Sequence, residues 1–274
     1  MKKLVFTLAT CCIMCACEQK TETNPFFTEF RTEYGAPDFD KIKIEHYEPA
    51  FLKGIEEQNA EIKAIVESRE TPGFENTIVA LDNSGRTLAR VKGVFYALTE
   101  ADTNDEMSAL SEKIAPVLSE HNDNIYLNQD LYKRVAAVWQ QEQEGKITLT
   151  TEQHRLLDRY YKAFIRSGAG LDAGKQNRLR EINKELSTLA ITFSNHVLNE
   201  NNAYRLVIDN EAELAGLPEW VKTGAAEEAK AVGKEGKWLF TLQNSSRLPL
   251  LQYADNRELR KDIYEAYINR GNNG

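Results

Sequence analysis

Apolar side chains recur at every third or fourth position over long stretches of this chain, and this spacing constrains the fold more than any other feature. The clearest stretch begins after Asp172, a residue suited to cap the first turn of a helix. Its apolar residues are Leu179, Ile182, Leu186, Leu189, Phe193 and Val197. This spacing is typical of one face of an α-helix. Because the pattern covers only about three heptads, fewer than a confident coiled coil needs, we predict a core helix of a bundle.

The same spacing predicts five further helices earlier in the chain. The first covers residues 46–68 and the second residues 75–100 as one continuous helix. The third ends at Tyr126, the fourth before Gly145 and the fifth near Gly168. These helices are long and the breaks between them are short, so this part of the chain is predicted to be a helical bundle.

The pattern changes after Tyr204. Residues 205–208 and 237–242 are short runs of β-forming residues bounded by turn formers, and they flank a predicted helix at 219–232. We expect them to pair as a small ribbon, after which the chain returns to helix. The fold class is therefore mainly α, a helical bundle with a small β-ribbon. The expected organisation is a signal peptide at 1–16, an extended segment at 17–45, the bundle at 46–203, and the ribbon with further helices at 204–274.

The N-terminus carries a signal for export. Two lysines at positions 2 and 3 precede an apolar run from Leu4 to Ala16, which is shorter than a membrane-spanning helix of roughly 20 residues. Ala16 directly before Cys17 resembles a bacterial lipobox, so we expect cleavage there and lipidation of Cys17. The protein would then be an exported, membrane-anchored lipoprotein facing the periplasm or the cell surface. Two alternatives are a weaker competing site at Cys12 and ordinary secretory cleavage with Cys17 unmodified.

Composition excludes several classes of function. All four cysteines lie in this N-terminal segment, so the rest of the chain has none for disulfides or for a thiolate nucleophile. About 250 remaining residues suffice to bury a stabilising apolar core without disulfides. The formal net charge is −8 and there is no basic stripe with interleaved aromatic residues, so we expect no nucleic-acid partner.

Two pairs of side chains have the spacing of metal ligands on one helix face: His196 with Glu200, and His154 with Asp158. A catalytic zinc ion needs three protein ligands and an open position for water. None of the four histidines belongs to a His-Glu-x-x-His motif. We therefore interpret both pairs as hydrogen bonds or ion pairs on helix surfaces, and we predict no metal site in this chain.

A polar cluster near the end of the chain is the strongest candidate for peptide binding. It consists of Tyr253, Asn256 and Arg257, whose side chains can form directional hydrogen bonds to a peptide backbone or a carboxylate. The alternative is that Asp255 or Asn256 caps the final helix while Arg257 pairs with a neighbouring acidic residue.

Several short sequence segments indicate a protein family. Asn24-Pro25-Phe26, Phe39-Asp-Lys-Ile-Lys43 and Glu45-His-Tyr-Glu-Pro-Ala-Phe51 occur near the start, and Tyr253-Ala-Asp-Asn-Arg-Glu-Leu259 and Tyr264-Glu-Ala-Tyr-Ile-Asn-Arg-Gly271 near the end. A further match runs from Phe193 to Pro218. In content and order these segments resemble the N-terminal part of bacterial peptidyl-dipeptidases (dipeptidyl carboxypeptidases), members of the thimet-oligopeptidase-like family of zinc metallopeptidases.

The resemblance implies both a function and a missing part. In the family this region forms one wall of a deep channel that admits oligopeptides, and dipeptides are released from their C-termini. The resemblance implies zinc as the cofactor of the whole enzyme, held in a C-terminal catalytic domain that would follow Gly274. We therefore expect an N-terminal fragment, truncated before that domain and inactive by itself.

Two other hypotheses stay open. One is a short non-enzymatic lipoprotein that binds peptides or a partner protein through the same wall. The other is a complementing half that assembles with a separately encoded catalytic half. In that case the face that meets the zinc domain should be apolar and should drive association or aggregation when it is left alone.

Overall fold

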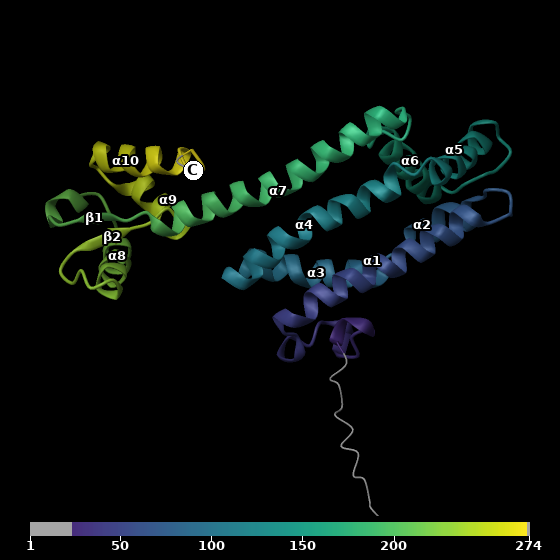
Figure 1. Cartoon of the computed structure of the whole chain (residues 1–274). Helices are drawn as coiled ribbons and strands as arrows, with labels where there is room; N and C mark the ends of the chain where they lie inside the picture. Colours follow the sequence, from purple (N-terminus) through teal and green to yellow (C-terminus); the bar gives the residue numbers. More distant parts are fainter. Residues whose placement is uncertain (1–23, 273–274) are drawn as a thin grey trace, which may run out of the picture.

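The computed structural model describes residues 24–272 and contains two lobes connected by one long helix (Figure 1). The first lobe contains α1 (Ile44–Glu67), α2 (Ala80–Asp82), α3 (Arg86–Ala101), α4 (Asp105–Tyr126), α5 (Gln129–Gln143) and α6 (Thr151–Arg166). Helix α7 (Ala173–Ala203) leads to the second lobe, which contains β1 (Leu206–Ile208), α8 (Glu219–Ala231), β2 (Trp238–Phe240), α9 (Asn244–Tyr253) and α10 (Arg257–Ile268). The predicted fold class, mainly α with a small ribbon, is confirmed.

The first lobe has two apolar cores. One lies between α1, α3 and α4 and combines aliphatic side chains with aromatic rings. Its Phe95 ring contacts those of Tyr47 and Phe51, with centroids 5.2 and 5.3 Å apart. The other joins the end of α1 to α5 and α6, with Leu131 and Phe164 fully buried. Edge-to-face rings add to the stabilisation that burial provides, so the lobe needs no covalent link.

Helices α1 and α3 approach each other closely at Gly54. A Cβ atom at this position would lie 2.7 Å from the backbone nitrogen of Leu88. Only a residue without a side chain fits there, so Gly54 sets the distance between the two helices. By contrast, a Cβ atom at Gly93, on the exposed side of α3, would meet nothing within 4 Å.

The predicted continuous helix at 75–100 is wrong. The structure forms a π-helical turn at Phe74–Val79, continues into α2, and breaks before α3. Gly85 has a left-handed backbone with φ of +73°, and its N–H donates to Glu61 Oε2 at 2.7 Å. Such a φ ends a helix readily at glycine. The apolar periodicity continued across this turn, which is why it concealed the break.

The prediction that the helix after Asp172 is a core helix is also wrong. Asp172 caps α7 as expected, since its carboxylate accepts a hydrogen bond from the Lys175 N–H at 3.0 Å. However, α7 buries none of its residues. Leu186, Leu189 and Phe193 are 57%, 55% and 56% exposed.

Polar side chains attach α7 to α4 instead. Asn183 Nδ2 donates to Asp123 Oδ1 at 2.8 Å, and Asn195 Nδ2 donates to Glu112 Oε1 at 2.8 Å. A third bond runs from Arg180 to an asparagine of α4 at 2.9 Å. We call this row of hydrogen bonds the α4–α7 seam.

The second lobe surrounds the predicted ribbon. Strands β1 and β2 pair antiparallel, with Leu206 opposite Phe240. Helices α8, α9 and α10 cover the ribbon and bury a third apolar core, and the Arg247 guanidinium lies 3.5 Å from the ring centre of Tyr267. The return to helix after β2 is confirmed, divided into α9 and α10.

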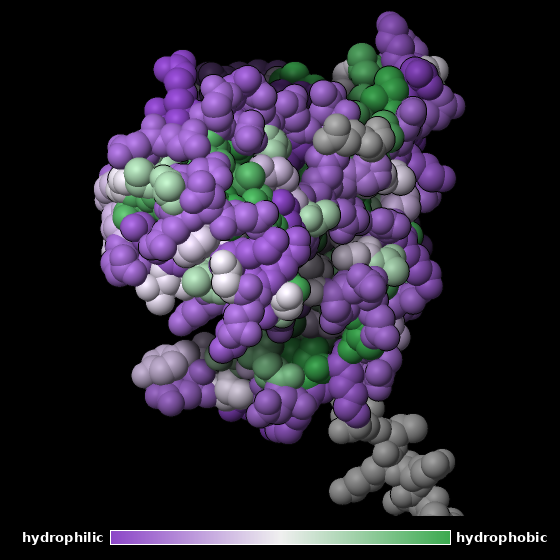
Figure 2. Space-filling view, turned by 90° about the vertical axis from the view of Figure 1, so that its left-hand side faces the viewer, coloured by the Kyte–Doolittle hydropathy of each residue, from purple (hydrophilic) through white to green (hydrophobic). Residues whose placement is uncertain are grey.

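The surface shown in Figure 2 is mostly hydrophilic, with separate apolar areas. No helix in the described part of the chain is long and apolar enough to span a membrane.

A buried polar cluster lies where α1, α4 and the break before α3 meet. His121 is 5% exposed, and its Nε2 lies 2.7 Å from Gln58 Oε1, while Gln58 Nε2 donates to Ser84 Oγ at 3.1 Å. The imidazole therefore donates through Nε2. Its Nδ1 has no hydrogen-bond partner within residues 24–272. Burial, reinforced by the charge of Lys92, lowers the pKa of His121, so the imidazole is neutral near pH 7.

Gly54→Ala should lower the free energy of unfolding by about 1–3 kcal/mol, because the added methyl group forces α1 and α3 apart. The matched control is Gly93→Ala, which should raise the free energy of unfolding by about 0.5–1 kcal/mol through helix propensity. Urea unfolding followed by circular dichroism measures both values. A Gly54→Ala variant as stable as the parent would show that the close approach is unimportant.

Stability should fall as the pH decreases from about 6.5 to 5. Because the pKa of His121 is lower in the folded state than its ordinary value of about 6.5, the unfolded chain binds the proton more tightly and is favoured by acid. In His121→Gln this part of the pH dependence should disappear, whereas it should persist in His196→Gln, which removes an exposed histidine. Urea unfolding at several pH values tests this. If the free energy of unfolding changed equally with pH in the two variants, the assignment of this pH dependence to His121 would be contradicted.

Candidate functional site

The C-terminal half of α7 is bordered by two clefts. The first, of about 360 Å³, lies between α7 and the N-terminal end of α4. Its wall is mostly polar and includes Asn104, Ser108, Asn195, His196, Asn199 and Asn202. A carboxamide carries both hydrogen-bond donors and an acceptor, as a peptide group does. The cleft therefore has the chemistry to bind an extended peptide through its backbone.

The second cleft, of about 420 Å³, lies between α7 and the second lobe. Arg270 lines this cleft and makes several contacts. Its guanidinium lies 3.7 Å from the ring centre of Tyr267 and donates to Asn201 Oδ1 at 3.1 Å, and its Nε donates to the Tyr267 carbonyl oxygen at 3.0 Å. A guanidinium held in this way suits a carboxylate ligand. Neither Arg270 nor Asn201 was predicted as a site residue from the sequence, although both lie within segments that carry the family resemblance.

In the two pairs with metal-ligand spacing, His196 with Glu200 and His154 with Asp158, three of the four side chains bond to other protein groups. Glu200 accepts a hydrogen bond from the Gly271 N–H at 2.8 Å, which ties the end of α7 to the turn after α10, while His196 lines the first cleft. His154 Nδ1 lies 2.8 Å from Glu142 Oε1, and Asp158 pairs with a lysine of its own helix at 2.7 Å. Within residues 24–272, no three His, Cys, Asp or Glu side chains are grouped so that they could hold a metal ion.

The predicted cluster of Tyr253, Asn256 and Arg257 spans the junction of α9 and α10. Asn256 caps α10, since its side-chain oxygen accepts a hydrogen bond from the Glu258 N–H at 3.0 Å. Tyr253 ends α9 and is 39% exposed. The capping role proposed as the alternative is therefore present, and a role of the three residues in peptide binding stays a prediction.

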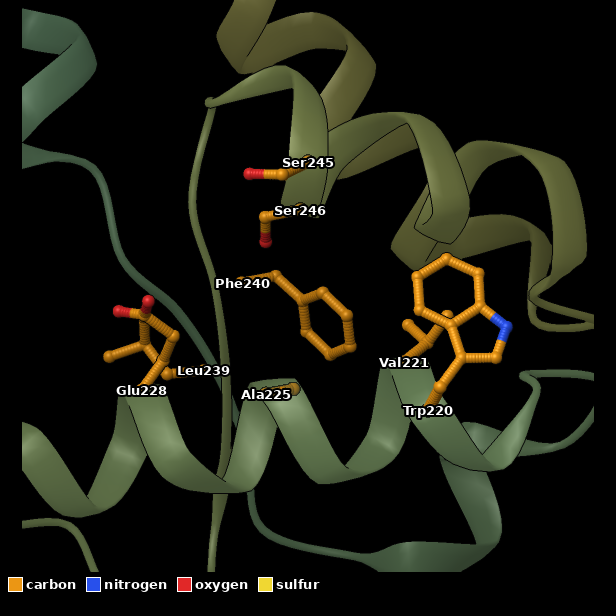
Figure 3. Close-up of a pocket in the computed structure, with 9 residues that line it drawn as sticks. Trp220, Val221, Ala225, Glu228, Leu239, Phe240, Ser245 and Ser246 are labelled. Carbon is orange, nitrogen blue, oxygen red and sulfur yellow. The ribbon is translucent and has the colours of Figure 1, made fainter.

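A smaller pocket of about 230 Å³ lies in the second lobe (Figure 3). Val221 and Ala225 of α8 face Phe240 of β2, and Trp220, 62% exposed, lies at its edge. Ser246 Oγ accepts a hydrogen bond from the Thr241 N–H at 2.9 Å, so this hydroxyl stabilises the turn into α9. The pocket suits an apolar side chain.

Comparison with known proteins identifies relatives over most of the chain. No protein-family model matches it. Dipeptidyl carboxypeptidase of Escherichia coli (strain K12) is 39% identical over 246 residues, which are 90% of this chain and 36% of that protein. Oligopeptidase A of Salmonella typhimurium is 33% identical over 248 residues, 90% of this chain and 35% of that protein. Saccharolysin of Saccharomyces cerevisiae is 25% identical over 203 residues, 73% of this chain and 28% of that protein.

The chain thus spans about a third of the length of the dipeptidyl carboxypeptidase and the oligopeptidase A that it matches. The family resemblance inferred from the sequence is confirmed. The chain belongs to the family of dipeptidyl carboxypeptidase and oligopeptidase A, and it corresponds to an N-terminal portion of these longer proteins.

Proposed function

We propose that this chain is the N-terminal part of a zinc peptidase that hydrolyses oligopeptides and releases dipeptides from their C-termini. The observation that carries the proposal is the 39% identity to a dipeptidyl carboxypeptidase over 90% of the chain. The identity to oligopeptidase A is lower, at 33% over the same share of the chain, which favours the dipeptide-releasing activity.

Residues 24–272 do not offer the ligands of a catalytic zinc ion. Three protein ligands are required, and within residues 24–272 no such group of side chains is present. We therefore assign no catalytic step to these residues. The role that we propose for them is to bind the peptide and to shape the channel through which it reaches a C-terminal catalytic domain.

The two clefts beside α7 support this role. Asn199 and Asn202 bring carboxamides to the first cleft, and these groups match the donors and acceptor of a peptide group. Asn195 and Asn104 in the same wall already bond to α4 through Nδ2 and Oδ1. Arg270, held against Tyr267 in the second cleft, suits the terminal carboxylate of a peptide. Both clefts are therefore candidate parts of the channel wall.

We also infer that Cys17 carries a lipid that anchors the protein to a membrane facing the periplasm or the cell surface. The support is the order of two lysines, an apolar run and Ala16 before Cys17. These residues lie outside the part of the chain that the structure describes.

The peptidase proposal is tested by reading the coding sequence downstream of the codon for Gly274. We expect an in-frame His-Glu-x-x-His motif. The protein from the complete reading frame should release dipeptides from an N-terminally blocked tetrapeptide in the presence of zinc and lose this activity with a chelator, whereas residues 17–274 alone should release none. Mass spectrometry of the products measures the result. A stop codon directly after Gly274 would contradict the peptidase assignment and leave a non-enzymatic lipoprotein.

Lipidation is tested by metabolic labelling with an alkyne fatty acid in a bacterial host. The parent and the control Cys12→Ser should be labelled and recovered in the membrane fraction. Cys17→Ser should lose the label and accumulate as an uncleaved precursor, because it lacks the thiol that accepts the lipid. Undiminished labelling of Cys17→Ser would show that another residue is modified.

A further inference from the structure

Helix α7 carries a continuous exposed apolar face. Leu186, Leu189 and Phe193 follow one another at spacings of three and four residues, so they lie on one side of the helix. Each is more than half exposed, at 57%, 55% and 56%. We call these three residues the α7 stripe.

The orientation of α7 is the reverse of that expected for an amphipathic helix on a globular core. Such a helix buries its apolar face and turns its polar face to water. Here the α4–α7 seam uses polar residues, among them Asn183 and Asn195, for the contact with the first lobe. Since the hydrogen bonds of the seam orient the helix, the stripe is left without a cover in the described part of the chain.

The end of the described chain lies at the stripe. A Cβ atom at Gly271 would lie 2.6 Å from Phe193 Cε2 and 3.0 Å from Val197 Cγ2, and the Gly271 N–H donates to Glu200 Oε2 at 2.8 Å. Figure 1 accordingly places the end of α10 beside the end of α7. Polypeptide that follows this turn would therefore begin next to Phe193.

We propose that the α7 stripe is covered by an amphipathic helix of the polypeptide that follows this region in the longer protein. This inference rests on the proposed function, which places a C-terminal domain after Gly274. The region matched is only 36% of the length of the E. coli relative, so there is ample polypeptide to supply the cover. The covering helix would carry apolar residues at spacings of three and four and would run along α7 for about 10 Å, the rise between Leu186 and Phe193.

The size of the stripe favours a tethered segment over a second copy of the chain. A stable contact between separate proteins buries roughly 800 Å² on each partner, whereas the stripe consists of three large side chains. A segment joined at Gly271 is present at a high effective concentration, so a small apolar contact suffices to seat it.

The test uses the protein from the complete reading frame, with an affinity tag at its N-terminal part and a protease site inserted after Gly274, so that the contact forms while the tether is intact. After cleavage, capture of the tag measures how much of the downstream polypeptide stays bound. The stripe variant is Leu186→Gln/Leu189→Gln/Phe193→Gln. The matched control is Leu52→Gln/Ile165→Gln/Val232→Gln, which replaces three apolar residues of similar exposure, 49%, 48% and 48%, away from the stripe. We expect the stripe variant to retain at least about tenfold less of the downstream polypeptide than the parent and the control, because the apolar contact is lost.

The isolated chain provides a check on folding. The stripe is exposed in the isolated chain, so the stripe variant should unfold at the same urea midpoint as the parent. It should also bind less of the dye ANS, which binds exposed apolar surface. Equal recovery of the downstream polypeptide by the stripe variant, or a large loss of its own stability, would overturn the inference. A concentration-dependent dimer that the stripe variant abolishes would identify a second copy as the occupant and would also overturn it.

Peptidase activity of the protein from the complete reading frame, measured before cleavage, separates the two proposals. Activity in the parent with undiminished recovery in the stripe variant would refute the covering helix and leave the proposed function intact. Stripe-dependent recovery without zinc-dependent activity would refute the proposed function and support the contact. A stop codon after Gly274 would overturn both.

Discussion

The hydrogen-bonded seam between α4 and α7 determines the layout of the molecule. It joins Asn183 to Asp123 and Asn195 to Glu112, and so holds a helix of 31 residues along the first lobe without burying any of them. Hydrogen bonds are directional, whereas apolar contacts are not. The seam therefore fixes the rotation of α7 about its own axis. That rotation decides which residues enter the clefts and which face is left for another partner.

The two lobes have separate apolar cores, and the clefts lie where α7 crosses between them. In the first lobe, aromatic rings around Phe95 and the close approach at Gly54 hold α1 and α3 together. In the second, Arg247 and Arg270 contact the ring of Tyr267 from 3.5 and 3.7 Å. The second contact places a guanidinium at the rim of a cleft. Rigid positioning of this kind is what a binding wall requires, because it reduces the entropy lost when a ligand binds.

Several polar residues that the sequence suggests as candidate ligands or binding groups make structural contacts in this protein. Glu200 holds the turn after α10, His154 contacts Glu142, and Asn256 caps α10. These ligand-type side chains therefore form structural contacts within and between helices. A pair of side chains four residues apart shares a helix face whatever its role, so this spacing by itself does not distinguish a metal ligand from a structural contact.

The sequence by itself determined the helical class and the ribbon at β1 and β2, because these depend on the local spacing of apolar and β-forming residues. It also determined the cap at Asp172 through capping chemistry, and the family through specific sequence segments. It did not determine the break at Gly85, where the apolar period runs on through a left-handed turn. Nor did it determine the surroundings of α7. A period of three to four residues shows that a helix has an apolar face, but only tertiary structure decides what that face meets. The seam turned Leu186 and Phe193 outward because the polar face of α7 had partners on α4.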